Sequence, residues 1–226
     1  MITVRRIFQK AYNPYVIMVV WILLLLCTNP FSTAYINDDW VYARSVKSFL
    51  ETGIFTVDDY CGSLIFSQVM WGSLFCLFGY SAIALKISTL VLALIGIFFM
   101  FKFCMELSGK EEASFWITLL FALNPVYMHL SVTFMTDIPF FVFTLMSLYF
   151  YVRTYNSNKL SYLIFALLFS VLAVLTRQSG ILLPLICIVF FVGKKRFHWK
   201  FHLLSIIALV FAFGAYKLML NHIVTI

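Results

Sequence analysis

The sequence predicts an all-α polytopic membrane protein, with about seven transmembrane helices and with interfacial helices in the first extracytoplasmic loop. Three observations predict this class. Of the 226 residues, 63% are apolar or aromatic. Only 11% are charged, whereas a soluble domain carries about 25%. Apolar runs fill most of the length, and about 20 such residues can cross a bilayer. This composition excludes a soluble enzyme and a disulfide scaffold, and no nucleic acid is expected as a partner despite the net charge of +7.

Seven stretches are long and apolar enough to be expected to cross the membrane. They are approximately residues 15–35, 82–103, 113–130, 138–152, 160–176, 180–193 and 201–220. The chain shows no internal repeat and no soluble domain. Residues 1–226 are therefore interpreted as one membrane-embedded module, in which residues 36–81 form an extracytoplasmic loop.

An eighth apolar segment, Ser63–Phe78, is short and contains Gln68 and Gly72. Short cytoplasmic loops retain Lys and Arg, and this rule decides whether the segment crosses. If it does not cross, most of the 16 basic residues fall on one side: Arg5, Arg6, Lys10, Lys102, Lys110, Arg153, Lys159, Lys194, Lys195, Arg196 and Lys200. The segment is therefore expected to lie in the outer interface or to dip into the outer half of the bundle. The N-terminus is expected to be cytoplasmic, and the chain is expected in the plasma (inner) membrane.

The N-terminal region also has the pattern of a signal peptide, with basic residues ahead of an apolar run and Ser32-Thr33-Ala34 as a cleavage site. A retained span is the preferred interpretation, because Pro14 is followed by about 20 apolar residues. The loop that follows lies outside the membrane in both cases.

This topology sorts the carboxylates as well. Three of them, Glu106, Glu111 and Glu112, face inward. The other six of the nine face outward: Asp38, Asp39, Glu51, Asp58, Asp59 and Asp137. Asp38 and Asp39 precede Trp40–Leu50, an amphipathic stretch with a helical pattern that Gly53 is expected to end. The pair has two interpretations: it caps this helix, or one member is a proton acceptor whose pKa is raised at the membrane border.

The second outer loop contains Thr136, Asp137 and Pro139. Thr136 or Asp137 can cap the next helix, and Pro139 is tolerated in its first turn. The alternative is functional, because the topology places Asp137 on the same face as Asp38 and Asp39, and convergent acids can activate a hydroxyl or bind a metal.

Basic residues at the same border allow two interpretations. Arg177, between two apolar runs, either snorkels to lipid phosphates or binds a lipid-linked phosphate with its planar guanidinium. Lys86, near the start of the second span, is a further candidate of the same kind. His129 is interpreted as an interfacial histidine rather than a ligand.

Taken in order, these motifs resemble the membrane module of the glycosyltransferase C superfamily. The resemblance covers about residues 10–220 and is to the branch similar to protein O-mannosyltransferases, aminoarabinose transferases and bacterial lipopolysaccharide sugar transferases, which is like glycosyltransferase family 39. The motifs that carry it are Asp38-Asp39-Trp40, Ala43-Arg44-Ser45-Val46, Glu51-Thr52-Gly53, Leu77-Phe78-Gly79-Tyr80-Ser81, Ala84-Leu85-Lys86-Ile87-Ser88, Leu123-Asn124-Pro125, Met135-Thr136-Asp137-Ile138-Pro139-Phe140 and Leu175-Thr176-Arg177-Gln178-Ser179-Gly180.

The resemblance implies transfer of a sugar from a polyprenyl-phosphate or polyprenyl-diphosphate donor to an acceptor hydroxyl, on a lipid or glycan, at the extracytoplasmic face. It implies that Asp38 or Asp39 is the general base, that Asp137 assists the acceptor or a metal, and that Arg177 contacts the donor phosphate. Cofactors stay open; a divalent metal, if one assists, is expected at Asp39 and Asp137.

Two alternatives remain from the sequence. One is a small multispan transporter, which usually places ionisable residues near the membrane midplane, whereas here they collect at one border. The other is an inactive membrane partner of a transferase. Members of the resembled families continue with further spans, whereas this sequence ends at Ile226; a truncated product, a fragment or one part of a split enzyme is therefore expected.

Overall fold

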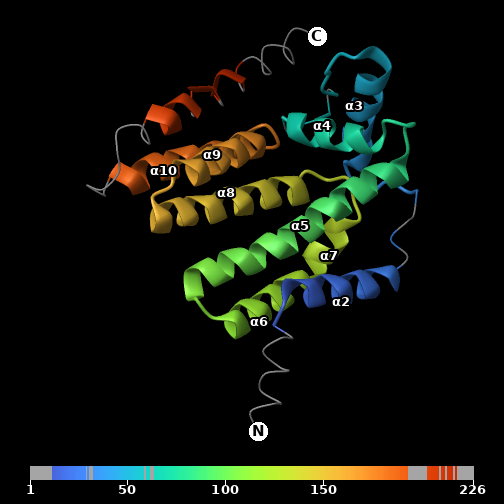
Figure 1. Cartoon of the computed structure of the whole chain (residues 1–226). Helices are drawn as coiled ribbons and strands as arrows, with labels where there is room; N and C mark the ends of the chain where they lie inside the picture. The colour runs from blue at the N-terminus through green and yellow to red at the C-terminus, as the bar shows by residue number, and fades with distance from the viewer. Residues whose placement is uncertain are drawn as a thin grey trace.

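The computed structural model describes residues 12–28, 30, 33–58, 60–61, 64–192, 203–208, 210–211, 213–215 and 217. Within them all regular structure is helical, which confirms the all-α class. The elements, drawn in Figure 1, are α2 (Pro14–Leu26), α3 (Asp39–Thr52), α4 (Phe66–Phe75), α5 (Ala82–Ser108), α6 (Glu111–Ala122), α7 (Pro125–Ser131), α8 (Asp137–Ser157), α9 (Leu160–Val174), the 3₁₀ turn η1 (Gln178–Ile181) and α10 (Leu182–Val192).

The long helix α5 organises the packing. It contacts α8, α6, α4 and α2, and α8 also packs against α9. The main core includes Trp21, Ile97 and Val142, each at most 1% exposed. Gly96 allows a close approach on α5, because a Cβ there would lie 2.5 Å from the Tyr127 hydroxyl and 2.9 Å from a Val142 methyl. The packing of α7 against α5 therefore depends on a glycine.

The structure shows fewer candidate spans than the seven expected. By length and composition α5, with 27 residues, can cross a bilayer alone, and α6 with α7 is a second candidate if the bent pair is one span. Helices coincide with the other expected spans, but α2, α9 and α10 have 13, 15 and 11 residues, fewer than the about 20 that a straight span needs.

The expected span 113–130 is interrupted. α6 ends at Ala122, and α7 begins at Pro125 after a bend of 64°. Pro125 has no backbone N–H and cannot continue α6. The side chain of Asn124 caps α7 instead, with Oδ1 accepting from the N–H of Val126 at 2.9 Å. The bend turns α7 toward the loop that carries Asp137.

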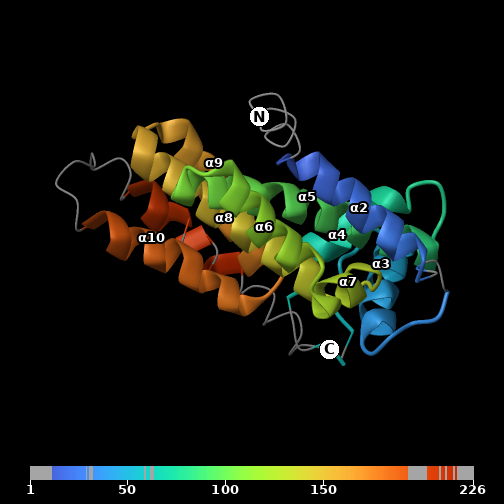
Figure 2. The same cartoon turned by 90° about the horizontal axis from the view of Figure 1, so that it is seen from below.

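The segment Ser63–Phe78 forms α4, a helix of ten residues. Ten residues span about 15 Å, half of the about 30 Å of hydrocarbon, so α4 is too short to cross as a straight helix. Its start is tied to the end of α9, because Ile65 N–H donates to Thr176 O at 3.4 Å and Ser67 N–H donates to Leu175 O at 3.2 Å. Figures 1 and 2 show α3 and α4 together at one end of the molecule.

The amphipathic helix after the acidic pair is confirmed as α3. It ends at Gly53, whose φ of 71° is the left-handed conformation of a helix C-cap. Its apolar face is covered by protein rather than left for the membrane interface, because Val41 and Val46 pack in one cluster with Val69, Leu85 and Phe134. Amphipathicity alone does not reveal which apolar surface covers a helix, and here that surface is other parts of the protein.

The charged residues separate to the two ends of the helices. We call the end with Asp39, Lys86, Asp137 and Arg177 the site end, and the end with Glu106 and Arg153 the opposite end. The basic residues at 5, 6, 10, 194, 195, 196 and 200, on which the expected orientation largely rests, lie outside the described residues.

Candidate active site

Asp39 lies in the first turn of α3 and is fully buried. Its Oδ2 accepts from the Ile36 N–H at 3.5 Å, while Oδ1 is buried without a hydrogen-bond partner among the described residues. Burial raises the pKa of this carboxyl above its ordinary value of 3.8, and the backbone amides of Phe134 and Ile36 and the charges of Lys86 and His129 offset part of the rise. A carboxylate in this setting is a candidate proton acceptor.

Asp38 is exposed and occupies the N-cap position of α3, yet its side chain makes no capping hydrogen bond. Its backbone carbonyl accepts from the N–H groups of Val41 at 2.9 Å and Tyr42 at 3.3 Å, as any residue there could do. Side-chain capping by Asp38 therefore does not account for the acidic pair.

Lys86 is 4% exposed, and its Nζ donates to the carbonyl of Ala34 at 2.7 Å. It lines a cavity of about 420 Å³, here called the Lys86 pocket. His129 lines the same pocket, and the remaining walls are mostly apolar residues from α2, α7 and the segments around them: Leu25, Thr28, Pro30, Ile36, Pro125, Met128 and Val132.

Arg177 and Asp137 form an ion pair, with Nη2 3.0 Å from Oδ1. The Arg177 Nε also donates to the Thr136 hydroxyl at 2.7 Å, and the guanidinium lies over the Phe140 ring at 5.9 Å from its centroid. Asp137 and Arg177 line a second cavity of about 510 Å³, the Arg177 pocket. Its other walls are largely aromatic: Phe121, Tyr127, Phe140 and Phe141.

The position of Arg177 depends on how the chain leaves α9. Its N–H donates to Ala173 O at 2.9 Å, and its carbonyl accepts from the Gly180 N–H at 2.9 Å. Gly180 is buried against the end of α9, where a Cβ would lie 2.6 Å from the Val174 nitrogen. Only glycine fits this turn without moving backbone, which is why the chain can fold back directly after the guanidinium.

The two pockets lie on different faces of α7. Pro125, Met128, His129 and Val132 line the Lys86 pocket, whereas Val126, Tyr127 and Leu130 line the Arg177 pocket. The helix α3 connects them, because Tyr42, one turn after Asp39, interacts with Thr136 and with the charge of Arg177. The structure thus associates Asp39 with Lys86 and Asp137 with Arg177, and it does not bring all four residues into one cavity.

Asp39 and Asp137 do not fit a shared metal site, since each is associated with a different cation and Asp137 is already paired with one at 3.0 Å. Within the described part of the chain, no group of three or more His, Cys, Asp or Glu side chains could hold a metal ion. We therefore derive no step through a metal.

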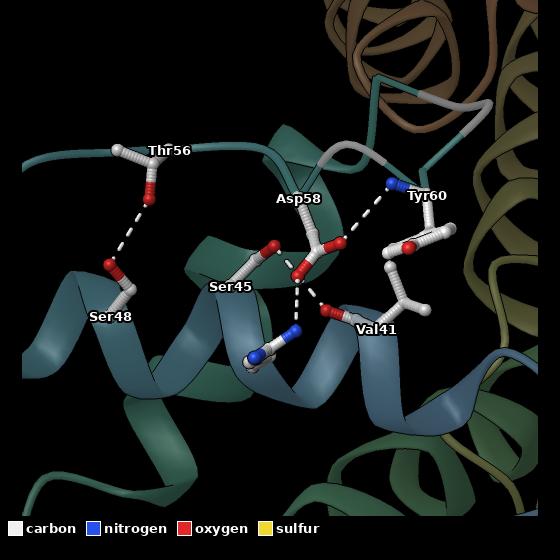
Figure 3. Close-up of polar contacts among 7 residues, drawn as sticks. Val41, Ser45, Ser48, Thr56, Asp58 and Tyr60 are labelled. Atoms are coloured by element: carbon white, nitrogen blue, oxygen red, sulfur yellow. Dashed lines mark hydrogen bonds and ion pairs between the residues drawn. The ribbon is translucent and has the colours of Figure 1, made fainter. Parts of the chain in front are cut away.

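Both side-chain oxygens of another outer carboxylate, Asp58, accept hydrogen bonds that hold a loop against α3 (Figure 3). Its Oδ2 accepts from Arg44 Nη1 at 3.1 Å, and its Oδ1 accepts from the Tyr60 N–H at 3.2 Å. A neighbouring bond of 3.1 Å between the hydroxyls of Ser48 and Thr56 also holds the segment 54–58 along α3. Asp58 thus fastens the loop above α3 and serves as a control carboxylate.

The structure adds three residues to the surroundings of the site. His129, interpreted from the sequence as an interfacial histidine, is exposed and lines the Lys86 pocket. Tyr42 and Thr136 surround the Arg177 guanidinium. The available signals were weak: His129 stands in the same outer segment as Asp137, and Tyr42 follows Asp39 by three residues, which places both on one face of a helix.

The chain is helical, one of its helices is long and apolar enough to cross a membrane, and two largely apolar pockets that contain charged residues lie at one end. The family model of dolichyl-phosphate-mannose-protein mannosyltransferase matches residues 65–217. The chain belongs to this family of membrane-bound glycosyltransferases, which use a dolichyl-phosphate sugar donor. The resemblance inferred from the motifs is thereby confirmed.

No curated protein matches the chain, and no solved structure does. The matched range includes Lys86, His129, Asp137 and Arg177 but begins after Asp38 and Asp39. The interpretation of the acidic pair therefore rests on the geometry described above.

Proposed function

We propose that the chain transfers a sugar from a polyprenyl-phosphate carrier to a hydroxyl of a lipid or glycan acceptor, at the extracytoplasmic face of the membrane. The observation that carries this proposal is the buried Asp39 carboxylate, whose pKa the charge of Lys86 lowers, together with the largely apolar pocket that Lys86 lines. Membership of a family that uses dolichyl-phosphate sugars supports the donor class.

Asp39 is the proposed general base. The acceptor oxygen attacks the anomeric carbon, its proton passes to the Asp39 carboxylate, and the bond from that carbon to the phosphate oxygen breaks. The electron pair of this bond moves to the phosphate. A raised pKa makes Asp39 a stronger base once it is ionised, and Lys86 helps to keep it ionised. Asp38, exposed beside it, is the second candidate.

Lys86 is the proposed contact to the donor phosphate. Its ammonium is a compact point charge suited to a phosphate, and it lines a pocket whose other walls are mostly apolar. Such walls favour the first isoprene units of a carrier lipid over water. In this proposal the phosphate lies between a cation and an apolar surface.

Arg177 is proposed to bind the substrate in the second pocket, and Asp137 is proposed to orient its guanidinium. The guanidinium has five N–H donors, and the bonds to Asp137 and Thr136 leave others for a substrate. The aromatic walls of this pocket suit the apolar face of a sugar ring or a lipid. We assign Asp137 and Arg177 to the side where the acceptor binds.

The central test is sugar transfer by membranes that contain Asp39→Asn, supplied with dolichyl-phosphate mannose. We expect a loss of at least about 10²-fold, because the amide cannot accept the acceptor proton. Asp58→Asn is the matched control and should retain transfer, since Asp58 only fastens the loop. If Asp38→Asn and Asp39→Asn both keep full transfer, the general-base assignment fails. An inactive partner would show no transfer even with the natural sequence.

The proposed location is the plasma (inner) membrane, with the N-terminus cytoplasmic and the site end outside. Single cysteines at the exposed positions Glu51 and Glu111 should react with an impermeant thiol reagent from opposite sides of the membrane. Labelling of both from one side would contradict this topology.

A further inference from the structure

The Lys86 pocket contains a second group that can bind an anion. Lys86 comes from the start of α5, and His129 comes from the last turn of α7. They are the titratable residues that line the cavity; its other walls are apolar apart from Thr28. Two nitrogen donors from different helices in an otherwise apolar pocket are an arrangement that recognises one anionic group.

The charges around this pocket are coupled to the proposed base. Both Lys86 and His129 favour the ionised form of Asp39. Arg177, another cation at this end, lines the cavity on the opposite face of α7 and is paired with Asp137.

We infer that His129 binds the phosphate of the lipid-linked donor together with Lys86 and stabilises the charge that this phosphate gains when the sugar leaves. This inference rests on the proposed function and deepens it by naming a second residue that contacts the donor phosphate. The pocket supplies the ammonium of Lys86 and the imidazole of His129.

The chemistry of a sugar phosphodiester matches this pair of groups. Before transfer the phosphate carries one negative charge, which Lys86 can balance. When the bond to the anomeric carbon breaks, its electron pair leaves a phosphate monoester whose second pKa is about 6. A histidine N–H provides a hydrogen bond to this second charge. The proton of the acceptor hydroxyl goes to Asp39, so His129 keeps its own proton.

Binding can be tested without turnover, by thermal unfolding of the purified full-length protein with and without dolichyl monophosphate. We expect the lipid to raise the unfolding temperature of the natural protein, because binding to the folded state stabilises it. His129→Ala and Lys86→Gln should each reduce this stabilisation, since each removes one contact to the phosphate. Lys102→Gln, on the same helix as Lys86 but near the opposite end, is the matched control.

Turnover provides the second measurement. With dolichyl-phosphate mannose as donor, His129→Ala should lower kcat about 10-fold to 10²-fold, with a smaller change in KM, because the interaction strengthens as charge develops. His129→Gln keeps an N–H donor and should recover part of kcat. A merely structural histidine would show no selective loss of kcat and no recovery by glutamine.

The outcomes separate this inference from the proposed function. If dolichyl monophosphate stabilises the natural protein in a His129-dependent manner but no sugar is transferred, the phosphate-binding role of His129 stands and the proposed function fails. If transfer occurs and His129→Ala changes neither the stabilisation by this lipid nor kcat, the inference fails alone. Equal stabilisation by inorganic phosphate would overturn the assignment to a lipid-linked phosphate.

Discussion

The two ends of the molecule use similar polar residues in different ways. At the opposite end, Arg153 Nη1 lies 3.0 Å from Glu106 Oε2, and Nη2 donates to the Tyr162 hydroxyl at 3.0 Å. The Asn156 side chain donates to the other oxygen of Glu106 at 2.8 Å. At the site end, Asp39 is more deeply buried, yet one of its oxygens has no partner among the described residues.

This difference separates stability from function. A carboxylate with both oxygens paired ties helices together, as Glu106 does for α5 and α8. A buried oxygen without a partner costs free energy of folding, and groups of this kind concentrate where a protein needs reactivity. We therefore expect changes at the site end to lower transfer and changes at the opposite end to lower stability.

Lys86→Met is expected to have the largest effect on this contrast between the two ends, as a loss of sugar transfer. Transfer should fall about 10²-fold, because the phosphate loses its cation. Since Lys86 also lowers the pKa of Asp39, its removal should raise that pKa further and move the acidic limb of the pH–rate profile to higher pH. Lys102→Met, on the same helix near the opposite end, is the control. An unchanged acidic limb would contradict the coupling of Lys86 to Asp39.

A smaller effect is expected for Asp39→Asn, and it is a gain in stability rather than a loss of transfer. Because burial raises the Asp39 pKa above 3.8, the folded chain holds this proton to higher pH than the unfolded chain does. The free energy of unfolding then falls as pH rises from the unfolded pKa through the folded one. Asparagine removes this loss, so the variant should be more stable near neutral pH, by up to about 2 kcal/mol.

Thermal unfolding in detergent at about pH 4 and about pH 8 measures this difference. The stabilisation by asparagine should be absent at the lower pH and present at the higher one. A variant that is less stable at neutral pH would mean that the Asp39 carboxylate holds the fold together, as the paired residues of the opposite end do.

The smallest effect concerns Arg153→Met at the opposite end. The pair with Glu106 is partly exposed, with 37% and 17% of the two side chains accessible. Its loss should lower the free energy of unfolding by about 1 kcal/mol. Transfer per folded molecule should stay unchanged, as measured by activity normalised to the folded fraction. A specific loss of transfer would break the proposed division between the two ends.

Much of the helical organisation could be predicted from the sequence. Apolar runs predicted where helices form, and Asp39 to Gly53 was recognisable as an amphipathic helix with a glycine stop. The separation of acids into two groups also followed from the pattern of charges. These features depend on residues that are close in sequence, so local sequence patterns predict them.

The rest depends on contacts between distant segments. The apolar run 113–130 contains Asn124-Pro125, and only the structure shows the chain bending there by 64°. Nothing local indicates that His129 shares a cavity with Lys86, or that Arg177 pairs with Asp137 across 40 positions of sequence. Such pairings arise from how helices pack, which periodicity does not encode.

The Arg177 pocket depends on Gly180, a residue that has no reactive side chain. Even the methyl group of alanine would press on the main chain at Val174 and force the turn outward. Arg177 lies only three residues before Gly180. A substitution of Gly180 would leave every charge intact and yet move the Arg177 guanidinium away from the Asp137 carboxylate. Inactivating changes in this protein are therefore expected among small residues that touch no substrate.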